Sequence, residues 1–173
     1  AARLKALNPE IEIRAHNEAL NETNALGIFS GYDIIIDGTD NFPAKFLISD
    51  AGVKAGKAVV YGAIQGFDGQ ASVFDVARGP CYRCLYPQPP AEPVQNCAEA
   101  GVIGAIAGMI GTLQAVEAIK LILNDPSFAP LTGRLWMIDL RNLETRVVNI
   151  PKRKDCAICA KAPRDIVLTS ASP

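Results

Sequence analysis

The chain has 173 residues, of which 49% are hydrophobic and 20% charged, a composition typical of one folded domain. Its 17 Lys and Arg residues nearly balance 18 Asp and Glu residues, which argues against a nucleic-acid partner or a membrane surface held by bulk charge. Charged residues interrupt the first part of the chain before any apolar run of signal-peptide length, so we expect a cytoplasmic protein.

The first half of the chain predicts helices and buried strands. Residues 3–7 have the pattern of a helix end, and residues 11–15 alternate apolar and charged side chains like a strand. The consecutive isoleucines in residues 33–37 predict a strand buried on both faces, as in a parallel sheet. Residues 42–57 have the apolar spacing of a helix that ends at a glycine, and residues 58–62 predict a second buried strand.

This strand, helix and strand predict a parallel pair joined by a crossover helix. The turn at residues 37–41 would then lie at the carboxyl end of a strand. Ligands bind at such ends in open α/β sheets, so this turn is the first candidate for a functional site.

The second half of the chain predicts a different pattern. Residues 70–76, 134–140 and 144–150 are strand-like, and the last two are close enough for an antiparallel hairpin, so we expect a mixed sheet. Residues 85–100 contain four prolines and predict an extended loop. The apolar, glycine-rich residues 101–123 predict a helix, whose small face would pack in the core or against a second subunit.

Polar residues within this last helix argue against a membrane span. Gln114, Glu117 and Lys120 lie three residues apart, and the uncharged part before them is too short to cross a bilayer. We therefore expect a buried helix and no membrane partner.

Two cysteine pairs give the strongest chemical signal. Cys81 and Cys84 form one pair, Cys156 and Cys159 the other, and two such pairs can complete a tetrahedral four-sulfur site. A structural zinc site that joins the end of the chain to its middle is the favoured interpretation. The alternative is a redox disulfide within one pair, although neither pair clearly opens a helix after a strand.

The fifth cysteine, Cys97, comes just before the glycine-rich helix. A helix amino terminus lowers the pKa of a thiol, which would make Cys97 a nucleophile. Unpaired cysteines are equally common as small apolar core residues, so the sequence leaves both interpretations open.

The turn at residues 37–41 contains carboxylates that suit a cation. Asp40 could hold Mg²⁺ beside a nucleotide phosphate. Asp40 or Asn41 ahead of Pro43 is also typical of a helix cap, which the local sequence by itself favours. Lys45, in the first turn of the helix, has the position of a solvated charge.

Taken together, these segments resemble the family of adenylyltransferases that activate ubiquitin-like proteins, in particular the bacterial members that serve molybdopterin and thiamine biosynthesis. The resemblance covers almost the whole chain and depends on the order of the motifs. They are Asp37-Gly-Thr-Asp40-Asn41-Phe42, Tyr61-Gly-Ala-Ile-Gln-Gly66, Cys81-Tyr-Arg-Cys84, Asn96-Cys97-Ala-Glu-Ala-Gly101-Val102, the glycine helix through Gln114-Ala115, and Cys156-Ala-Ile-Cys159.

The resemblance implies a Rossmann-like α/β domain with a mixed β-sheet and a structural zinc site. Such an enzyme uses MgATP to adenylate the carboxyl-terminal glycine of a ubiquitin-like sulfur-carrier protein that ends in Gly-Gly, and releases pyrophosphate. The acyl adenylate then accepts sulfur. The resemblance also implies a homodimer.

The same resemblance implies roles for individual residues. Asp40 matches the catalytic aspartate that places Mg²⁺ and the phosphates, and Asn41 and Lys45 lie with it at the nucleotide. Lys45 stands where the family commonly carries arginine, which loses bidentate contact with phosphate. The two cysteine pairs match the zinc ligands, and Cys97 matches the loop cysteine that some members use in covalent transfer.

The glycine-rich phosphate loop and first nucleotide-binding strands of the family would lie upstream of residue 1. We therefore expect residues 1–163 to be the carboxyl-terminal part of a single adenylyltransferase domain, followed by a polar tail at 164–173, and the chain alone to be inactive. The alternative is a non-catalytic, zinc-stabilised module that docks the tail of the carrier protein. A nicotinamide-dependent dehydrogenase is disfavoured, because no G-x-G-x-x-G motif occurs in the sequence.

Overall fold

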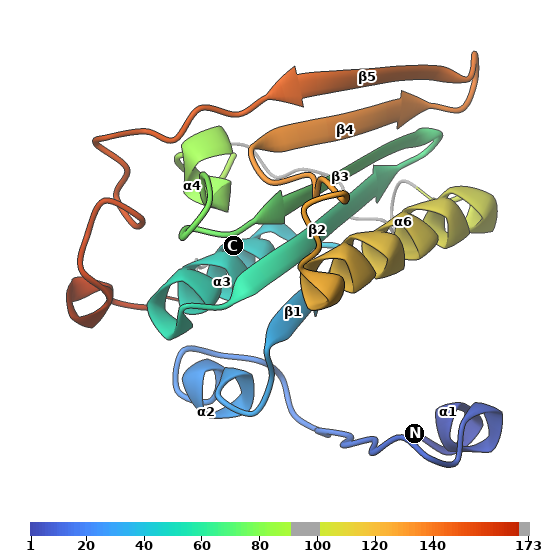
Figure 1. Ribbon diagram of the computed structural model, residues 1–173, viewed down its shortest axis with the longest axis horizontal. Coiled ribbons are helices and arrows are strands. Elements are labelled where there is room, and N and C mark those ends of the chain that lie inside the picture. Colours follow the sequence, from blue (N-terminus) through green and yellow to red (C-terminus); the bar gives the residue numbers. More distant parts are fainter. Residues whose placement is uncertain (91–100, 170–173) are drawn as a thin grey trace.

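The computed structural model describes residues 1–90 and 101–169 (Figure 1). The described part contains a five-stranded sheet with the order β1-β2-β3-β4-β5. β1 and β2 are parallel and the other neighbours antiparallel, so the predicted mixed α/β sheet is confirmed. The elements are α1 (Ala2–Leu7), α2 (Ala25–Phe29), β1 (Ile34–Asp37), α3 (Phe42–Ala55), β2 (Ala58–Gln65), β3 (Asp68–Phe74), α4 (Tyr82–Leu85), α6 (Gly104–Leu123), β4 (Arg134–Asp139), β5 (Glu144–Asn149) and a 3-10 helix (Pro163–Asp165).

The unit β1–α3–β2 forms at the residues that the sequence predicts. The expectation that the first strand is buried on both faces is wrong, because Ile36 in the middle of β1 is 51% exposed. Asn41 begins α3, because its side chain accepts a hydrogen bond from the backbone N–H of Ala44 at 2.9 Å. Gly56 ends the helix with a φ of 66°, in the left-handed region that favours glycine. Ile35 pairs with Val59 in the parallel register, so the carboxyl ends of both strands meet at one edge of the sheet.

The β2–β3 hairpin is longer than the sequence predicts. Its strands run through Gly62 and Gly69, and Gly66 forms part of the turn with a φ of 56°. A Cβ atom on Gly62 would lie 2.6 Å from Cδ of Gln114, and one on Gly69 would lie 2.7 Å from Cδ1 of Ile110. These two glycines therefore admit α6 to the sheet surface, and they do not break the strands.

Helices cover the two faces of the sheet separately (Figure 1). On one face, Phe46 of α3 belongs to the same buried cluster as Tyr61 and Phe74. On the other face, Ala118 of α6 packs in a cluster with Val60. Both helices thus approach the carboxyl ends of β1 and β2 from opposite sides.

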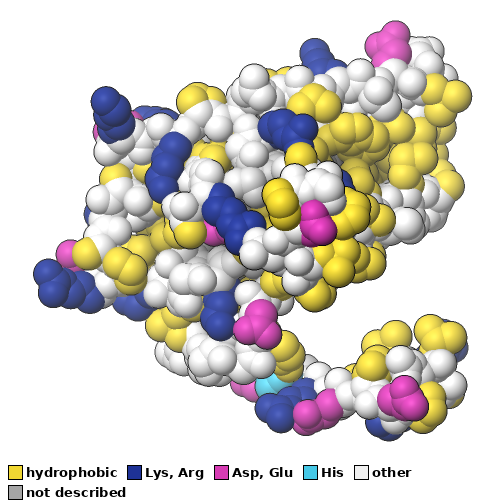
Figure 2. Space-filling view, viewed as in Figure 1, with side chains coloured by type: hydrophobic (Ala, Val, Ile, Leu, Met, Phe, Trp, Pro, Cys, Tyr) yellow, Lys and Arg dark blue, Asp and Glu magenta, His cyan; other side chains and the backbone are white. Residues whose placement is uncertain are grey.

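The predicted buried helix, α6, is buried along one face only. By length and composition α6 could cross a membrane, but Ile106, Ile110 and Glu117 are buried within the fold. Ile119 and Ile122 are exposed on the remaining surface, and Figure 2 shows hydrophobic side chains gathered in this region. The helix therefore offers the sheet one apolar face and leaves a second one open.

The glycines of α6 do not bring another described segment close. A Cβ atom built on Gly104, Gly108 or Gly111 would meet nothing within 4 Å. The close backbone approach expected from their spacing is therefore absent among the described residues.

The amino-terminal segment departs from the prediction in part. The helix expected at residues 3–7 is confirmed as α1, but the strand predicted at residues 11–15 is wrong, since this segment has no regular structure. Alternation alone forms no strand without a neighbouring edge, and the segment pairs with none of the described strands. α1 has no buried residue and lies apart from the sheet (Figure 1).

The chain returns to the core after β5. Cys156, Ile158 and Ile166 are buried in the cluster that surrounds α3, and the ammonium of Lys54 donates a hydrogen bond to the carbonyl of Ile166. The first described residues of the predicted tail therefore pack against α3.

Candidate functional site

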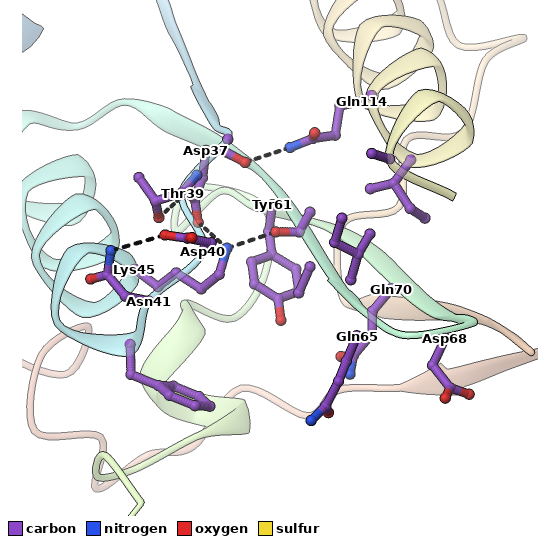
Figure 3. A pocket seen from close by; sticks show the side chains of 18 of the residues that line it. Asp37, Thr39, Asp40, Asn41, Lys45, Tyr61, Gln65, Asp68, Gln70 and Gln114 are labelled. Carbon is purple, nitrogen blue, oxygen red and sulfur yellow. Dashed lines mark hydrogen bonds and ion pairs between the residues drawn. The ribbon is translucent and has the colours of Figure 1, made fainter. Parts of the chain in front are cut away.

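A cavity of about 420 Å³ lies at the carboxyl ends of β1 and β2, between α3 and α6 (Figure 3). The turn after β1, the amino terminus of α3, the β2–β3 hairpin and α6 all contribute to its walls. The polar and aromatic side chains that line it are Asp37, Thr39, Asp40, Asn41, Phe42, Lys45, Tyr61, Gln65, Asp68, Gln70, Tyr86 and Gln114.

A buried ion pair forms the floor of this cavity. The ammonium of Lys45 lies 3.1 Å from Oδ2 of Asp37 and donates a hydrogen bond to the carbonyl of Gly62 at 2.7 Å. The same ammonium lies 5.0 Å from the ring centroid of Tyr61. Lys45 is only 7% exposed, so its interpretation as a solvated charge is wrong. The first turn of α3 directs its side chain across the ends of both parallel strands.

The two carboxylates of the turn have different surroundings. Asp37 is buried, and its Oδ1 accepts hydrogen bonds from the backbone N–H and the hydroxyl of Thr39 at 2.9 and 2.6 Å. Asp40 is exposed at the cavity, where its carboxylate accepts a bond from the amide of Asn41 at 3.3 Å. Asn41 makes the cap of α3, so the capping interpretation is confirmed for Asn41. Asp40 is left as the carboxylate of this turn that can meet a ligand.

Gln114 joins α6 to the strand ends. Its Nε2 donates to the carbonyl of Asp37 at 2.7 Å and to the carbonyl of Val60 at 3.2 Å. These bonds join the amide of Gln114 to backbone oxygens of both parallel strands beside the cavity. Gln114 therefore fixes the position of the turn that carries Asp40.

Two amides, a hydroxyl and the carboxylate of Asp68, which forms an ion pair with Arg141, surround the other end of the cavity. Gln65 and Asp68 lie beside the hairpin turn, and Gln70 faces the carboxyl end of α4. The hydroxyl of Tyr86 donates to Oε1 of Gln70 at 3.3 Å. This end offers donors and acceptors suited to an extended peptide backbone.

The second candidate site is the cluster formed by Cys81, Cys84, Cys156 and Cys159, here called the four-cysteine cluster. Its sulfur atoms all lie within 4.8 Å of one another. The sulfurs of Cys81 and Cys84 are 3.9 Å apart, and each lies 3.5 Å from a sulfur of the other pair. A tetrahedral zinc ion with bonds of about 2.3 Å places its sulfurs about 3.8 Å apart, so the cluster fits such an ion.

The four thiols of the cluster influence one another's ionisation, and, despite burial, backbone hydrogen bonds lower the pKa of Cys156. Burial, together with the neighbouring thiols, raises the pKa of Cys81 well above its usual range. Burial and the contacts with Cys84 and Cys156 raise the pKa of Cys159 to about 11. A bound cation would reverse this by stabilising the thiolates. Because the fold brings all four thiols together, the four-sulfur site is favoured over a redox disulfide within one pair.

A family model described as the ThiF family matches residues 1–158. The chain belongs to the ThiF family. The Adenylyltransferase and sulfurtransferase MOCS3 of Anopheles gambiae is 44% identical over 166 residues, covering 92% of this chain and 36% of that protein. The Sulfur carrier protein adenylyltransferase of Thermus thermophilus is 41% identical over 167 residues, covering 93% of this chain and 61% of that protein. The chain thus spans about one to two thirds of these relatives' lengths.

Solved structures agree with this fold. A crystal structure of E. coli MccB with ATP superposes with a TM-score of 0.73 at 14% identity, covering 92% of this chain and 49% of that one. A crystal structure of E. coli MccB with MccA-N7isoASN gives a TM-score of 0.72 at 13% identity, covering 92% and 50%. At this level of identity the likeness concerns the ThiF-type fold alone.

The ThiF-family structure brings some of the predicted residues together. Asp40, Asn41 and Lys45 lie around one cavity, and the cysteine pairs meet in one cluster. Cys97 lies outside the described residues, so its predicted role stays a prediction.

Sequence reasoning assigned no site role to several residues that line the cavity. An isolated amide gives little indication of a role, so Gln70 could not be recognised from the sequence. Gln114 did leave a signal, because Gln114 and Glu117 lie three residues apart on an apolar helix and both are buried. Asp37, Tyr61 and Gln65 lay in motifs that the sequence analysis singled out, but no individual role was assigned to them. Asp68, Gln70 and Tyr86 were not singled out at all.

Removal of the Lys45 charge should destabilise the fold. Lys45→Met leaves the carboxylate of Asp37 buried without its cation, so we expect the free energy of unfolding to fall by about 3 kcal/mol. Adding Asp37→Asn should recover part of this loss. Denaturant unfolding measures both effects, with Lys161→Met on the surface as the matched control. Equal stability of the Lys45 and Lys161 variants would contradict this role for the pair.

The four-cysteine cluster should bind one zinc ion per chain. Cys156→Ser removes one ligand, so we expect it to lose most of the bound zinc and to lower the Tm. Mass spectrometry of the metal content measures the first effect and thermal unfolding the second. Cys97→Ser is the matched control and should keep one zinc ion. Full zinc content in the Cys156 variant would count against the cluster.

Proposed function

We propose that the protein to which this chain belongs uses MgATP to adenylate the carboxyl-terminal glycine of a ubiquitin-like sulfur-carrier protein. The observation that carries the proposal is the exposed carboxylate of Asp40 at the cavity. The second carboxylate of the same turn, Asp37, is paired with Lys45, so Asp40 is the one available to a ligand. The names of the relatives that are 41% and 44% identical support the same chemistry.

The proposed reaction joins two anions. The carboxylate of the carrier attacks the α-phosphorus of ATP, the bond to pyrophosphate breaks, and a mixed anhydride forms. Mg²⁺ bound at Asp40 would offset the charge of the phosphates. Lys45 offsets the charge of Asp37 and keeps both strand ends in place, so that a second uncompensated carboxylate does not repel the substrates.

The other end of the cavity suits the tail of the carrier. A tail that ends in Gly-Gly presents backbone groups and no side chains beyond Cα. The amides of Gln65 and Gln70 can donate to its carbonyl oxygens and accept from its N–H groups. We propose that the tail enters past these residues and directs its carboxylate toward Asp40.

The 173 residues include no glycine-rich phosphate loop of the kind that the resemblance implies. We therefore propose that adenylation needs phosphate-binding residues in addition to those described, and that residues 1–173 alone do not catalyse it. Adenylate formation can be followed as ATP-pyrophosphate exchange in the presence of a sulfur carrier that ends in Gly-Gly.

Asp40→Asn should impair exchange in a protein that includes the phosphate-binding region. Loss of the carboxylate weakens the hold on Mg²⁺ and the phosphates, so we expect the exchange rate to fall by about 100-fold. Asp33→Asn, at an exposed position before β1, is the matched control and should exchange at the wild-type rate. Undiminished exchange in the Asp40 variant would contradict the role of this residue. Carrier binding without any exchange would instead favour a docking module.

We also propose that the exposed face of α6 joins two copies of the chain. This face contains Met109, Val116, Ile119 and Ile122, whose side chains are 39–70% exposed. Open apolar surface of this kind is typical of an interface.

The combined change Val116→Glu and Ile119→Glu should convert a dimer into a monomer. Two carboxylates in an apolar interface would be desolvated without partners. Sedimentation velocity measures the oligomeric state, and Val167→Glu, at a 75% exposed position, is the control. A wild-type protein that sediments as a monomer would contradict the proposal.

A further inference from the structure

The two residues between Cys81 and Cys84 connect the four-cysteine cluster to other parts of the fold. Tyr82 is only 1% exposed, and Arg83 reaches α3. Both belong to α4, which is a helix of four residues. A single turn of helix is not stable alone, so the position of α4 depends on its tertiary contacts.

Tyr82 connects the four-cysteine cluster to the wall of the cavity. Its ring centroid lies 5.4 Å from that of Tyr61 and 5.1 Å from that of Tyr86. Both of these partners line the cavity. Phe46 and Phe74 contact Tyr82 from its other sides, at 5.0 and 5.6 Å. A shift of Tyr82 within this packed group would therefore move the aromatic wall of the cavity.

Arg83 fixes α4 to α3 and to the segment that follows. Its guanidinium makes a bidentate contact with the buried carboxylate of Asp50, with Nε and Nη2 at 3.0 and 2.7 Å. It also stacks on the ring of Phe46 at 4.7 Å. Its Nη1 donates to the carbonyl of Pro87 at 3.3 Å, immediately after the wall residue Tyr86.

We propose that Tyr82 and Arg83 are positioning residues that couple metal binding at the four-cysteine cluster to the shape of the cavity. Metal fixes Cys81 and Cys84 at the two ends of one helical turn, and Tyr82 transmits that position to Tyr61 and Tyr86. Such coupling is reciprocal, so a disturbance of the aromatic wall must also change the metal affinity. The inference concerns this chain's own geometry and is independent of the reaction proposed above.

Fluorine NMR of the chain labelled with 3-fluorotyrosine tests the coupling. The sequence has four tyrosines, three in the aromatic group and Tyr32 outside it. Single Tyr→Phe variants assign the signals. Removal of zinc with a chelator should shift or broaden the signals of Tyr61 and Tyr86, while Tyr32 keeps its position. Unchanged signals of Tyr61 and Tyr86 after complete loss of zinc would overturn the proposal.

Variants that retain zinc separate coupling from general unfolding. Tyr82→Leu, with zinc still bound, should shift the signals of Tyr61 and Tyr86 and weaken zinc affinity about fivefold or more. Tyr82→Phe should restore both, because the Tyr82 hydroxyl has no hydrogen-bond partner among the described residues. Tyr32→Leu is the matched control and should have wild-type affinity. Wild-type signals or wild-type zinc affinity in Tyr82→Leu would refute the coupling, even if chelation unfolds the whole chain.

Discussion

The buried pair of Lys45 and Asp37 is the interaction on which the candidate site depends. It joins the first turn of α3 to the end of β1 through Asp37 and to β2 through the carbonyl of Gly62. A charge pair of this kind adds little stability compared with apolar packing, but each partner is costly to bury without the other. The main contribution of the pair is therefore to orient the turn between β1 and α3. The charge of Asp37 is offset by Lys45, and its carboxylate accepts hydrogen bonds from Thr39. The turn therefore presents a single exposed carboxylate, that of Asp40.

The two helices that cover the sheet contribute to the site in different ways. α3 supplies the cation and the capped turn, and so determines the chemistry at one end of the cavity. α6 supplies Gln114, whose amide donates hydrogen bonds to backbone oxygens of β1 and β2, and the glycines of the β2–β3 hairpin allow α6 to approach the sheet. The four-cysteine cluster lies on the α3 side, where the apolar core is largest. The site is thus assembled from segments that are distant in sequence and meet only in the complete sheet.

Local sequence was sufficient wherever the determining interactions are local. The cap at Asn41, the left-handed Gly56 and the strand-like residues of β4 and β5 each depend on a few neighbouring residues, so these elements were predictable. The pairing of cysteines at metal-ligand spacing was predictable for the same reason. The strand predicted at residues 11–15 is wrong because a strand needs a neighbouring strand to pair with, and an alternating sequence does not supply one. The buried state of Lys45 also escaped prediction, since only the tertiary fold reveals that Asp37 and the carbonyl of Gly62 lie within its reach.

The separation of the cysteine pairs has a consequence for when the four-cysteine cluster would take up a metal ion. Cys81 and Cys156 are 75 positions apart, and α6, β4 and β5 all lie between them. Closing a loop of this length has an entropic cost that the folded sheet must already have met before four sulfurs can converge. On the ribosome, the second pair emerges only after β5 has been synthesised. Uptake of a metal ion at this cluster would therefore follow the formation of the sheet, and a bound ion would indicate that the sheet is complete.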